Sequence, residues 1–180
     1  MKEARELIYD AIVQYRRMKN TGVVAVFEKD RFDKYSYFAR IGEDSMGGKG
    51  RGLAFMGYIL KKHQELNTYE NLPVTIPKTV VLCTDIFDEF MEANKLYQLA
   101  LSDIPDEEIL KHFLACKLPK RLVADFLAFF EAIKNPVAIR SSSLLEDSHY
   151  QPFAGIFSTY MIPYIEDKLE MVRMMSDGIK

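Results

Sequence analysis

The spacing of apolar residues along the chain predicts several amphipathic helices. Over residues 2–18 they recur every three or four positions, which is the period of a helix with one buried face. The same period predicts helices over residues 53–62 and 119–133, and from residue 166 onward. The stripe of the N-terminal helix consists of Leu7, Ile8, Ala11, Ile12, Tyr15 and Met18, and that of the helix over residues 53–62 consists of Leu53, Met56, Ile59 and Leu60.

Short runs of β-branched and aromatic residues between these helices predict strands. After one of them, Thr84 is the candidate N-cap of a helix through about residue 93, and a further helical pattern starts near residue 102. Helices interspersed with short strands, without a regular βαβ period, favour an α+β or mixed α/β fold. The predicted strands cover residues 23–27, 35–41, 78–83, 137–140 and 155–162.

The last predicted helix carries apolar residues up to the end of the chain. Leu169, Val172, Met175 and Ile179 follow the helical period. An apolar face of this kind requires a packing partner. We therefore expect the partner to lie outside the chain, which would make the chain a fragment of a larger protein.

The composition is that of a soluble globular protein of one domain or two small subdomains. The chain has 180 residues, of which 48% are hydrophobic and 28% charged, and a formal net charge of −2. This balance of charges argues against a protein that binds nucleic acid. The aromatic segment over residues 35–38 is the one feature that favours nucleic-acid binding. No apolar run approaches the ~20 residues that span a bilayer, and no signal-type core follows the N-terminus. Cys83 and Cys116 lie among apolar neighbours without a CxxC partner, so reduced core thiols in a cytoplasmic protein are expected, and no metal site.

Residues 42–50 are predicted as a glycine-rich loop that ends in Gly47-Gly48-Lys49-Gly50. Glycines let the backbone approach phosphate oxygens and direct successive N–H groups at them, and a following helix adds its positive end. Lys49 adds a mobile positive charge. The segment is not a P-loop, because Glu43 stands at the first glycine position and a glycine follows the lysine in place of Ser or Thr. On residue chemistry alone, a surface turn with a solvated Lys49 is the alternative.

A second candidate anion site lies at the end of the predicted strand over residues 137–140. There the chain changes from apolar residues to Arg140, three serines and two carboxylates. A guanidinium beside an apolar strand is costly to bury unless an anion meets it, and its fork of N–H donors fits phosphate oxygens. The alternative is a structural bridge from Arg140 to Glu146 or Asp147.

A serine nucleophile in this segment is a competing hypothesis. It would need a positioned base beside the hydroxyl. The histidines do not favour it, since His63 and His112 lie in polar helical segments and the surroundings of His149 are not a GxSxG elbow.

The two motifs, in this order and spacing, resemble the phosphoenolpyruvate synthase and pyruvate, phosphate dikinase family. Residues 47–54, GGKGRGLA, are similar to that family's GGK(G/A)xxLxxM. Residues 139–147, IRSSSLLED, are similar to its VRSSAxxED, and residues 153–155 to the FAG that follows. The resemblance covers roughly residues 38–163. It implies an ATP-grasp-like N-terminal subdomain, with residues 1–34 as a lead-in helix or the tail of a preceding domain and residues 35–180 as a partial ATP-binding domain, truncated at its C-terminal end.

By resemblance, the parent enzyme splits ATP to AMP, phosphorylates a histidine on a swivelling domain and then phosphorylates pyruvate on a barrel domain. Lys49 and Arg140 would contact the ATP phosphates, where cations stabilise a transferring phosphoryl group. Gly155 and Thr159 would line the nucleotide site. The phosphocarrier histidine, the ligands of Mg²⁺ and both downstream domains are expected outside the chain. No catalytic or metal-ligating residue is therefore assigned within it, and we expect it to be inactive alone.

The sequence departs from the family pattern at two points. Ile156 and Phe157 stand where relatives carry glutamines after FAG, and Ser143 replaces the usual alanine. Two alternatives therefore stay open. One is a noncatalytic or regulatory module of the same fold, and the other is a relative that phosphorylates a different acceptor, such as a glucan or an antibiotic.

Overall fold

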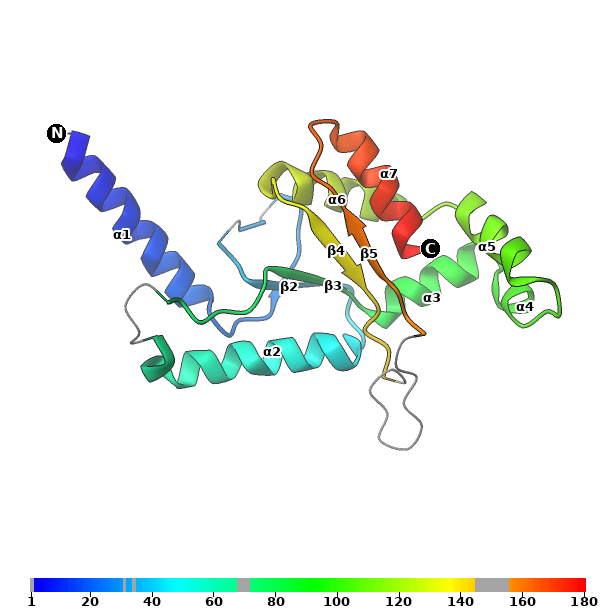
Figure 1. The fold of residues 1–180 in the computed structure, drawn as a ribbon, viewed down its shortest axis with the longest axis horizontal. Helices are drawn as coiled ribbons and strands as arrows, with labels where there is room; N and C mark the ends of the chain where they lie inside the picture. The colour runs from blue at the N-terminus through cyan, green and yellow to red at the C-terminus, as the bar shows by residue number, and fades with distance from the viewer. Residues whose placement is uncertain (1, 31, 34, 68–71, 145–155) are drawn as a thin grey trace.

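Helices alternate with short strands in two small sheets, which confirms the predicted α+β fold (Figure 1). The computed structural model describes residues 2–30, 32–33, 35–67, 72–144 and 156–180. Its helices are α1 (Lys2–Asn20), α2 (Gly47–Lys62), α3 (Thr84–Ala93), α4 (Tyr97–Ala100), α5 (Asp106–Ala115), α6 (Lys120–Ala132) and α7 (Lys168–Ile179), with a 3₁₀ turn at Gln64–Asn67. Its strands are β1 (Ala25–Val26), β2 (Phe38–Ile41), β3 (Thr79–Leu82), β4 (Val137–Arg140) and β5 (Thr159–Ile162).

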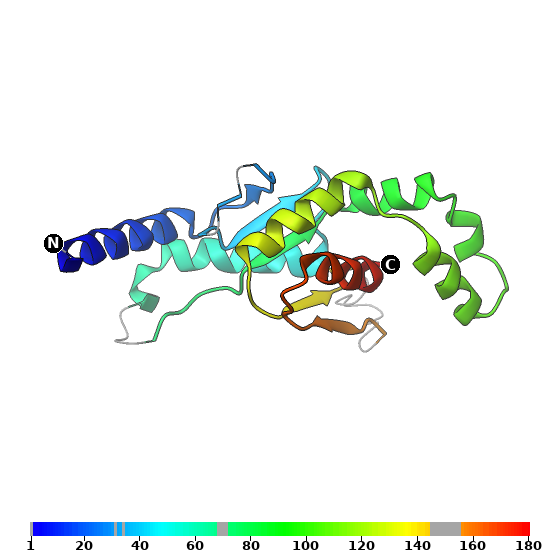
Figure 2. The ribbon, with the colours of Figure 1, turned by 90° about the horizontal axis from the view of Figure 1, so that it is seen from above.

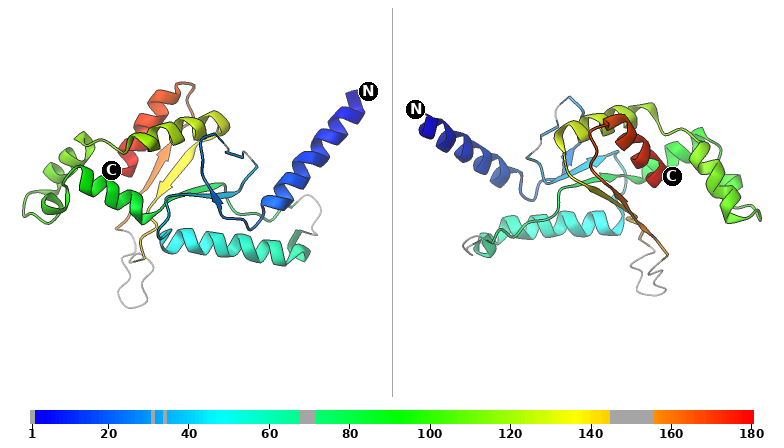
Figure 3. Two further views of the ribbon diagram at one scale, coloured as in Figure 1. Left: turned by 180° about the vertical axis from the view of Figure 1, so that it is seen from behind. Right: turned by 45° about the horizontal axis from the view of Figure 1, so that its top comes forward.

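Three of the strands form a parallel sheet in the order β1-β2-β3. Helix α2 provides the crossover from β2 to β3, and it lies on the opposite side of these strands from α6 (Figure 3). Alternate residues of β2 and β3 therefore face different helices, as the period-2 pleat requires. Phe38 and Val81 pack toward α2, whereas Ala39 and Ile41 belong to the larger core that includes α6.

Helix α2 approaches the sheet at two glycines as well as at the predicted residues Leu53 and Leu60, which pack against the core around Phe38 and Val81. A Cβ on Gly50 would lie 3.3 Å from the Val81 side chain, and one on Gly57 would lie 3.2 Å from Ile76. The prediction that Met56 lies on the buried face is wrong, because its side chain is 55% exposed. Small residues at these two positions bring the helix axis close to β3.

The larger core joins α3, α6 and α7 to the other face of the parallel sheet and to the β4–β5 hairpin (Figure 2). Leu122, Phe126 and Phe130 of α6 are buried there. Val172 and Met175 of α7 are buried in the same core, so these residues have their packing partners inside the chain rather than outside it. Leu169 remains 69% exposed.

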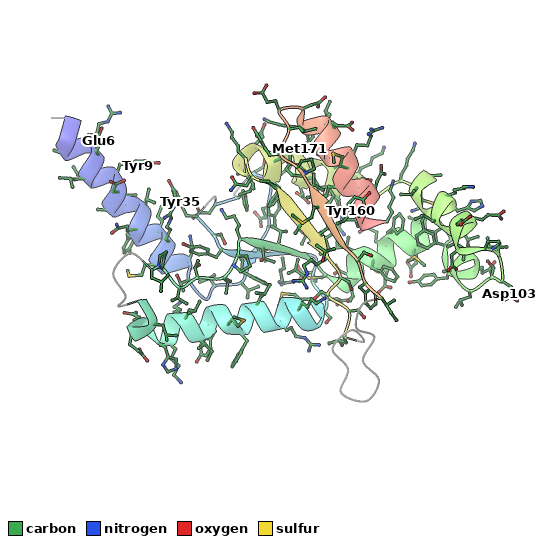
Figure 4. All side chains as sticks on the ribbon, viewed as in Figure 1. Glu6, Tyr9, Tyr35, Asp103, Tyr160 and Met171 are labelled. Carbon is green, nitrogen blue, oxygen red and sulfur yellow. The ribbon has the colours of Figure 1, made fainter. Side chains whose placement is uncertain are left out.

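Helix α1 projects from the rest of the molecule, at the end opposite α4 and α5 (Figure 2). The Asp33 carboxylate joins its C-terminal end to the following segment by accepting hydrogen bonds from Arg16 (3.2 Å), Asn20 (3.1 Å) and the Tyr35 N–H (2.9 Å). The hydroxyls of Tyr9 and Tyr35 lie 3.4 Å apart (Figure 4). The apolar stripe of α1 is exposed, and its members include Leu7, Ile8, Ile12, Tyr15 and Met18.

Several element boundaries differ from the prediction. Cys83 rather than Thr84 is the N-cap of α3, and no side-chain hydrogen bond caps this helix. The helical pattern that starts near residue 102 corresponds to α5, which ends before α6 begins, and α4 precedes it as a separate short helix. In the part of the chain that the structure describes, no helix combines the length and apolarity needed to cross a membrane. Cys83 and Cys116 are free thiols, as predicted.

Candidate functional site

The glycine-rich segment is a short loop followed directly by a helix. Residues 47–50 form the first turn of α2, so the prediction that the loop extends to Gly50 is wrong. The loop proper covers residues 42–46. Gly47 begins the helix at φ +71°, which is a left-handed conformation that only glycine adopts without strain.

Ser142, two residues after β4, binds the start of α2 on one side. Its carbonyl oxygen accepts a hydrogen bond from the Gly48 N–H at 2.9 Å. Its hydroxyl accepts one from the Gly50 N–H at 2.9 Å and donates one to the Met46 carbonyl at 2.7 Å. These contacts join segments that are more than 90 residues apart in sequence. They place the two sequence motifs side by side.

The start of α3 binds the same loop on its other side. The Asp85 carboxylate accepts hydrogen bonds from the N–H groups of Glu43 (3.1 Å) and Asp44 (3.4 Å). The Thr84 hydroxyl accepts one from the Ser45 N–H at 3.3 Å, and the Thr84 N–H donates to the Ser45 carbonyl at 2.9 Å. The loop is therefore held from both sides by residues distant in sequence.

Arg140 and Thr159 lie opposite each other in the antiparallel β4–β5 pair. Directly opposed residues point to the same face of a sheet, with Cβ atoms about 5 Å apart. Both residues are exposed, and so are their neighbours on that face, Ala138 and Met161. Ile139 and Tyr160 point the other way, where they lie against Gly178 of α7. The structure thus brings two of the predicted site residues onto one open face.

Lys49 is half-buried and stands between the two glycines whose N–H groups bind Ser142. Arg140 precedes Ser142 by two residues, so its Cα lies within about 7 Å of the Ser142 Cα. Lys49 and Arg140 consequently lie close to the same contact, the one between Ser142 and the first turn of α2, although they come from different motifs. No described carboxylate pairs with Arg140. Its proposed structural partners, Glu146 and Asp147, and the predicted site residue Gly155 lie outside the described residues.

Two polar residues beside the loop were not among the predicted site residues, although one of them belongs to the run of serines after Arg140. Arg40 is the penultimate residue of β2, and its guanidinium donates to the Gly42 carbonyl and lies 3.9 Å from the Glu43 carboxylate. Burial raises the pKa of the neighbouring Cys83 thiol, although Arg40 acts in the opposite direction. Ser142 is the other, and its role could not be read from sequence because every contact that defines it is long-range.

Neither a metal centre nor a serine–histidine pair is present in the described ranges. Asp44, Asp85 and Asp88 line a hollow beside the loop, but among the described residues no three His, Cys, Asp or Glu side chains are grouped to hold a metal ion. The described residues therefore do not fit Mg²⁺. His63 lies at the far end of α2 from Ser142, about 24 Å along the helix, and bonds Glu65 at 2.7 Å. His149 lies outside the described residues.

The part of the chain that carries both motifs matches a known family. No curated protein and no solved structure matches the chain. The family model described as "Pyruvate phosphate dikinase, AMP/ATP-binding domain" matches residues 43–177, about three quarters of the chain, and includes the loop, Ser142 and the β4–β5 hairpin. This domain is the nucleotide-binding region of pyruvate phosphate dikinase-like enzymes. The chain therefore belongs to the pyruvate phosphate dikinase AMP/ATP-binding domain family, as its two motifs predict.

Proposed function

We propose that this chain binds the phosphates of ATP with Lys49 and Arg140, and that Thr159 lines the same site. One observation carries the proposal: the hydrogen bonds of Ser142 join the Lys49 segment to the Arg140 segment. The two cations are suited to different parts of the task. Arg140 offers a planar fork of donors to phosphate oxygens, and Lys49 offers a mobile point charge. Gly155 belongs to the same proposal through the resemblance alone.

The exposure of Arg140 supports this assignment. A guanidinium on an open strand face without a described carboxylate partner is available to an anionic ligand. Thr159, directly opposite, adds a hydroxyl that can donate to or accept from the nucleotide. The side chains therefore bind and orient a polyphosphate.

We further infer that the chain is the ATP-binding portion of a larger phosphotransferase in the cytoplasm. In that enzyme, ATP would phosphorylate a histidine on a swivelling domain, which would then phosphorylate pyruvate. The family match from residue 43 supports the proposed division into residues 1–34 and a nucleotide-binding domain over residues 35–180. Because the described residues do not group to hold a metal ion, the part proposed for them is to hold the nucleotide.

Isothermal titration of the chain with ATP tests the site. We expect Lys49→Ala and Arg140→Ala each to weaken ATP binding roughly 10- to 100-fold, because a hydrogen bond to a charged group contributes about 1.5–3 kcal/mol. Lys62→Ala is the matched control, since Lys62 lies in the last turn of the same helix, about 20 Å from Lys49. Unchanged affinity in both site variants would refute the assignment, and so would an equal loss in the control.

A noncatalytic module of the same fold is the second candidate. Ile156 is 64% exposed and Phe157 is 37% exposed, and neither side chain can hydrogen-bond a nucleotide. If these residues have replaced nucleotide contacts, Ile156→Gln with Phe157→Gln should raise ATP affinity. An intact chain that binds no ATP, together with a double variant that does, would favour this candidate over the first.

A further inference from the structure

The Ser142 hydroxyl caps the first turn of α2, which the side chain of the N-cap residue does not do. The N-cap residue of α2 is Met46, whose side chain makes no capping hydrogen bond. A capping side chain accepts a hydrogen bond from an N–H of the first turn. The Ser142 hydroxyl does so for Gly50, although it comes from the end of β4. The cap of α2 is therefore supplied by the other motif.

These contacts also use the N–H groups that a helix start would otherwise offer to an anion. The Gly48 N–H donates to the Ser142 carbonyl, and the Gly50 N–H donates to the Ser142 hydroxyl. The Gly47 N–H donates to the Ser45 hydroxyl at 3.2 Å. A phosphate near α2 therefore meets three glycine N–H groups that already have acceptors. Binding then depends on the side chains of Lys49 and Arg140, and on how accurately these are placed relative to each other.

The backbone of α2 is shaped for this contact. A Cβ on Gly47 would lie 1.7 Å from the Ser142 carbonyl oxygen and 2.6 Å from its hydroxyl oxygen. Only a residue without a side chain lets Ser142 approach so closely. The absence of a Cβ at Gly47 and the capping hydroxyl of Ser142 are thus two parts of one close contact.

We propose that Ser142 is a positioning residue, which fixes Lys49 of α2 relative to Arg140 of β4 and thereby sets the affinity for the nucleotide phosphates. The inference rests on the proposed function, and it adds a residue that does not itself need to touch the nucleotide. Of the Ser142 bonds described above, removing the hydroxyl breaks those to Gly50 and Met46 and leaves the bond from Gly48 to the Ser142 carbonyl. The cations remain, but their relative position is no longer fixed.

A double-mutant cycle with ATP titration separates positioning from general destabilisation. We expect Ser142→Ala to weaken ATP binding about tenfold and Ser142→Thr, which keeps a hydroxyl, to restore most of it. In a Lys49→Ala background, the same Ser142→Ala change should cost less than about twofold, because the placement of Lys49 no longer matters. Ser141→Ala is the matched control, since the described contact of the Ser141 hydroxyl is local, a hydrogen bond accepted from the Ser143 N–H. Equal losses in both backgrounds would overturn the proposal, and so would tighter binding by Ser142→Ala.

Amide hydrogen exchange decides whether the contact exists independently of ATP. The Gly50 N–H should be protected in the wild-type chain and should exchange about tenfold faster in Ser142→Ala but not in Ser141→Ala. If the wild-type chain bound no ATP, the proposed function would fail, while this exchange result would still support or overturn the fixing of α2 by Ser142. Unchanged exchange in Ser142→Ala would overturn it whatever the affinity for ATP.

Discussion

Replacing Gly47 by alanine places a Cβ where the structure has the Ser142 carbonyl oxygen. The residue has φ +71°, and the new Cβ would lie 1.7 Å from that oxygen. A left-handed conformation costs a non-glycine residue about 1–2 kcal/mol. Relieving the contact requires Ser142 to move away, which breaks its hydrogen bonds to Gly48 and Gly50, each of which contributes about 1 kcal/mol. We expect Gly47→Ala to lower the free energy of unfolding by about 3 kcal/mol.

Gly52→Ala is the matched control for this prediction. Gly52 is exposed, lies in the same helix, and would place its Cβ in open space. Alanine in an exposed helix interior is more favourable than glycine by about 0.5–1 kcal/mol, so this variant should be more stable than the wild type. Urea unfolding followed by circular dichroism measures both changes. Equal or same-sign effects of Gly47→Ala and Gly52→Ala would refute the assigned contact between Gly47 and Ser142.

Three further predictions concern ionisable groups that the proposed function does not use. Burial raises the pKa of Asp33, but hydrogen bonds from the Tyr35 N–H and from α1 outweigh this effect and hold the pKa below 3.8. Asp33→Asn should therefore lower the melting temperature at pH 7. The difference from the wild type should vanish as the pH falls below about 3.8. Burial raises the pKa of Asp125, so stability should fall as the pH rises through the interval above 3.8, and Asp125→Asn should melt higher than the wild type at pH 7 but not near pH 3. Burial also raises the pKa of the Cys83 thiol, and native-state alkylation followed by mass spectrometry should therefore modify Cys116 well before Cys83; equal rates would contradict the burial of Cys83.

The elements that could be predicted from sequence are those whose own residues determine them. The strand over residues 137–140 is found where the apolar run predicts it, as β4 (Val137–Arg140). Helix α1 is likewise found because its period extends over five turns. The start of α2 could not be predicted, because glycines disfavour a helix and the cap that stabilises it comes from Ser142, more than 90 residues later.

The buried face of α2 shows a second limit of reasoning from the pattern. The period selects bulky residues, and it assigned Met56 to the core. The structure instead places Gly57 against Ile76, where a Cβ would lie 3.2 Å from the Ile76 side chain, closer than an ordinary van der Waals contact. The hydrophobic period predicts which residues of a helix are favourable to bury. The distance between the helix and the sheet decides which side chains fit between them. That distance is a property of the assembled fold.

The two sides of the loop together explain why the candidate site depends on side-chain cations. On the α3 side, the N–H groups of Glu43 and Asp44 already bind an anion, the carboxylate of Asp85. On the β4 side, the first turn of α2 is capped by Ser142. A loop bound on both sides loses little conformational entropy when a ligand arrives, since its backbone is fixed beforehand. The N–H groups named above, however, donate hydrogen bonds to other parts of the protein and are not available to a phosphate. On the proposed function, a phosphate would bind Lys49 and Arg140, and the specificity of the site would depend on the distance between these two side chains, which only the folded protein brings together.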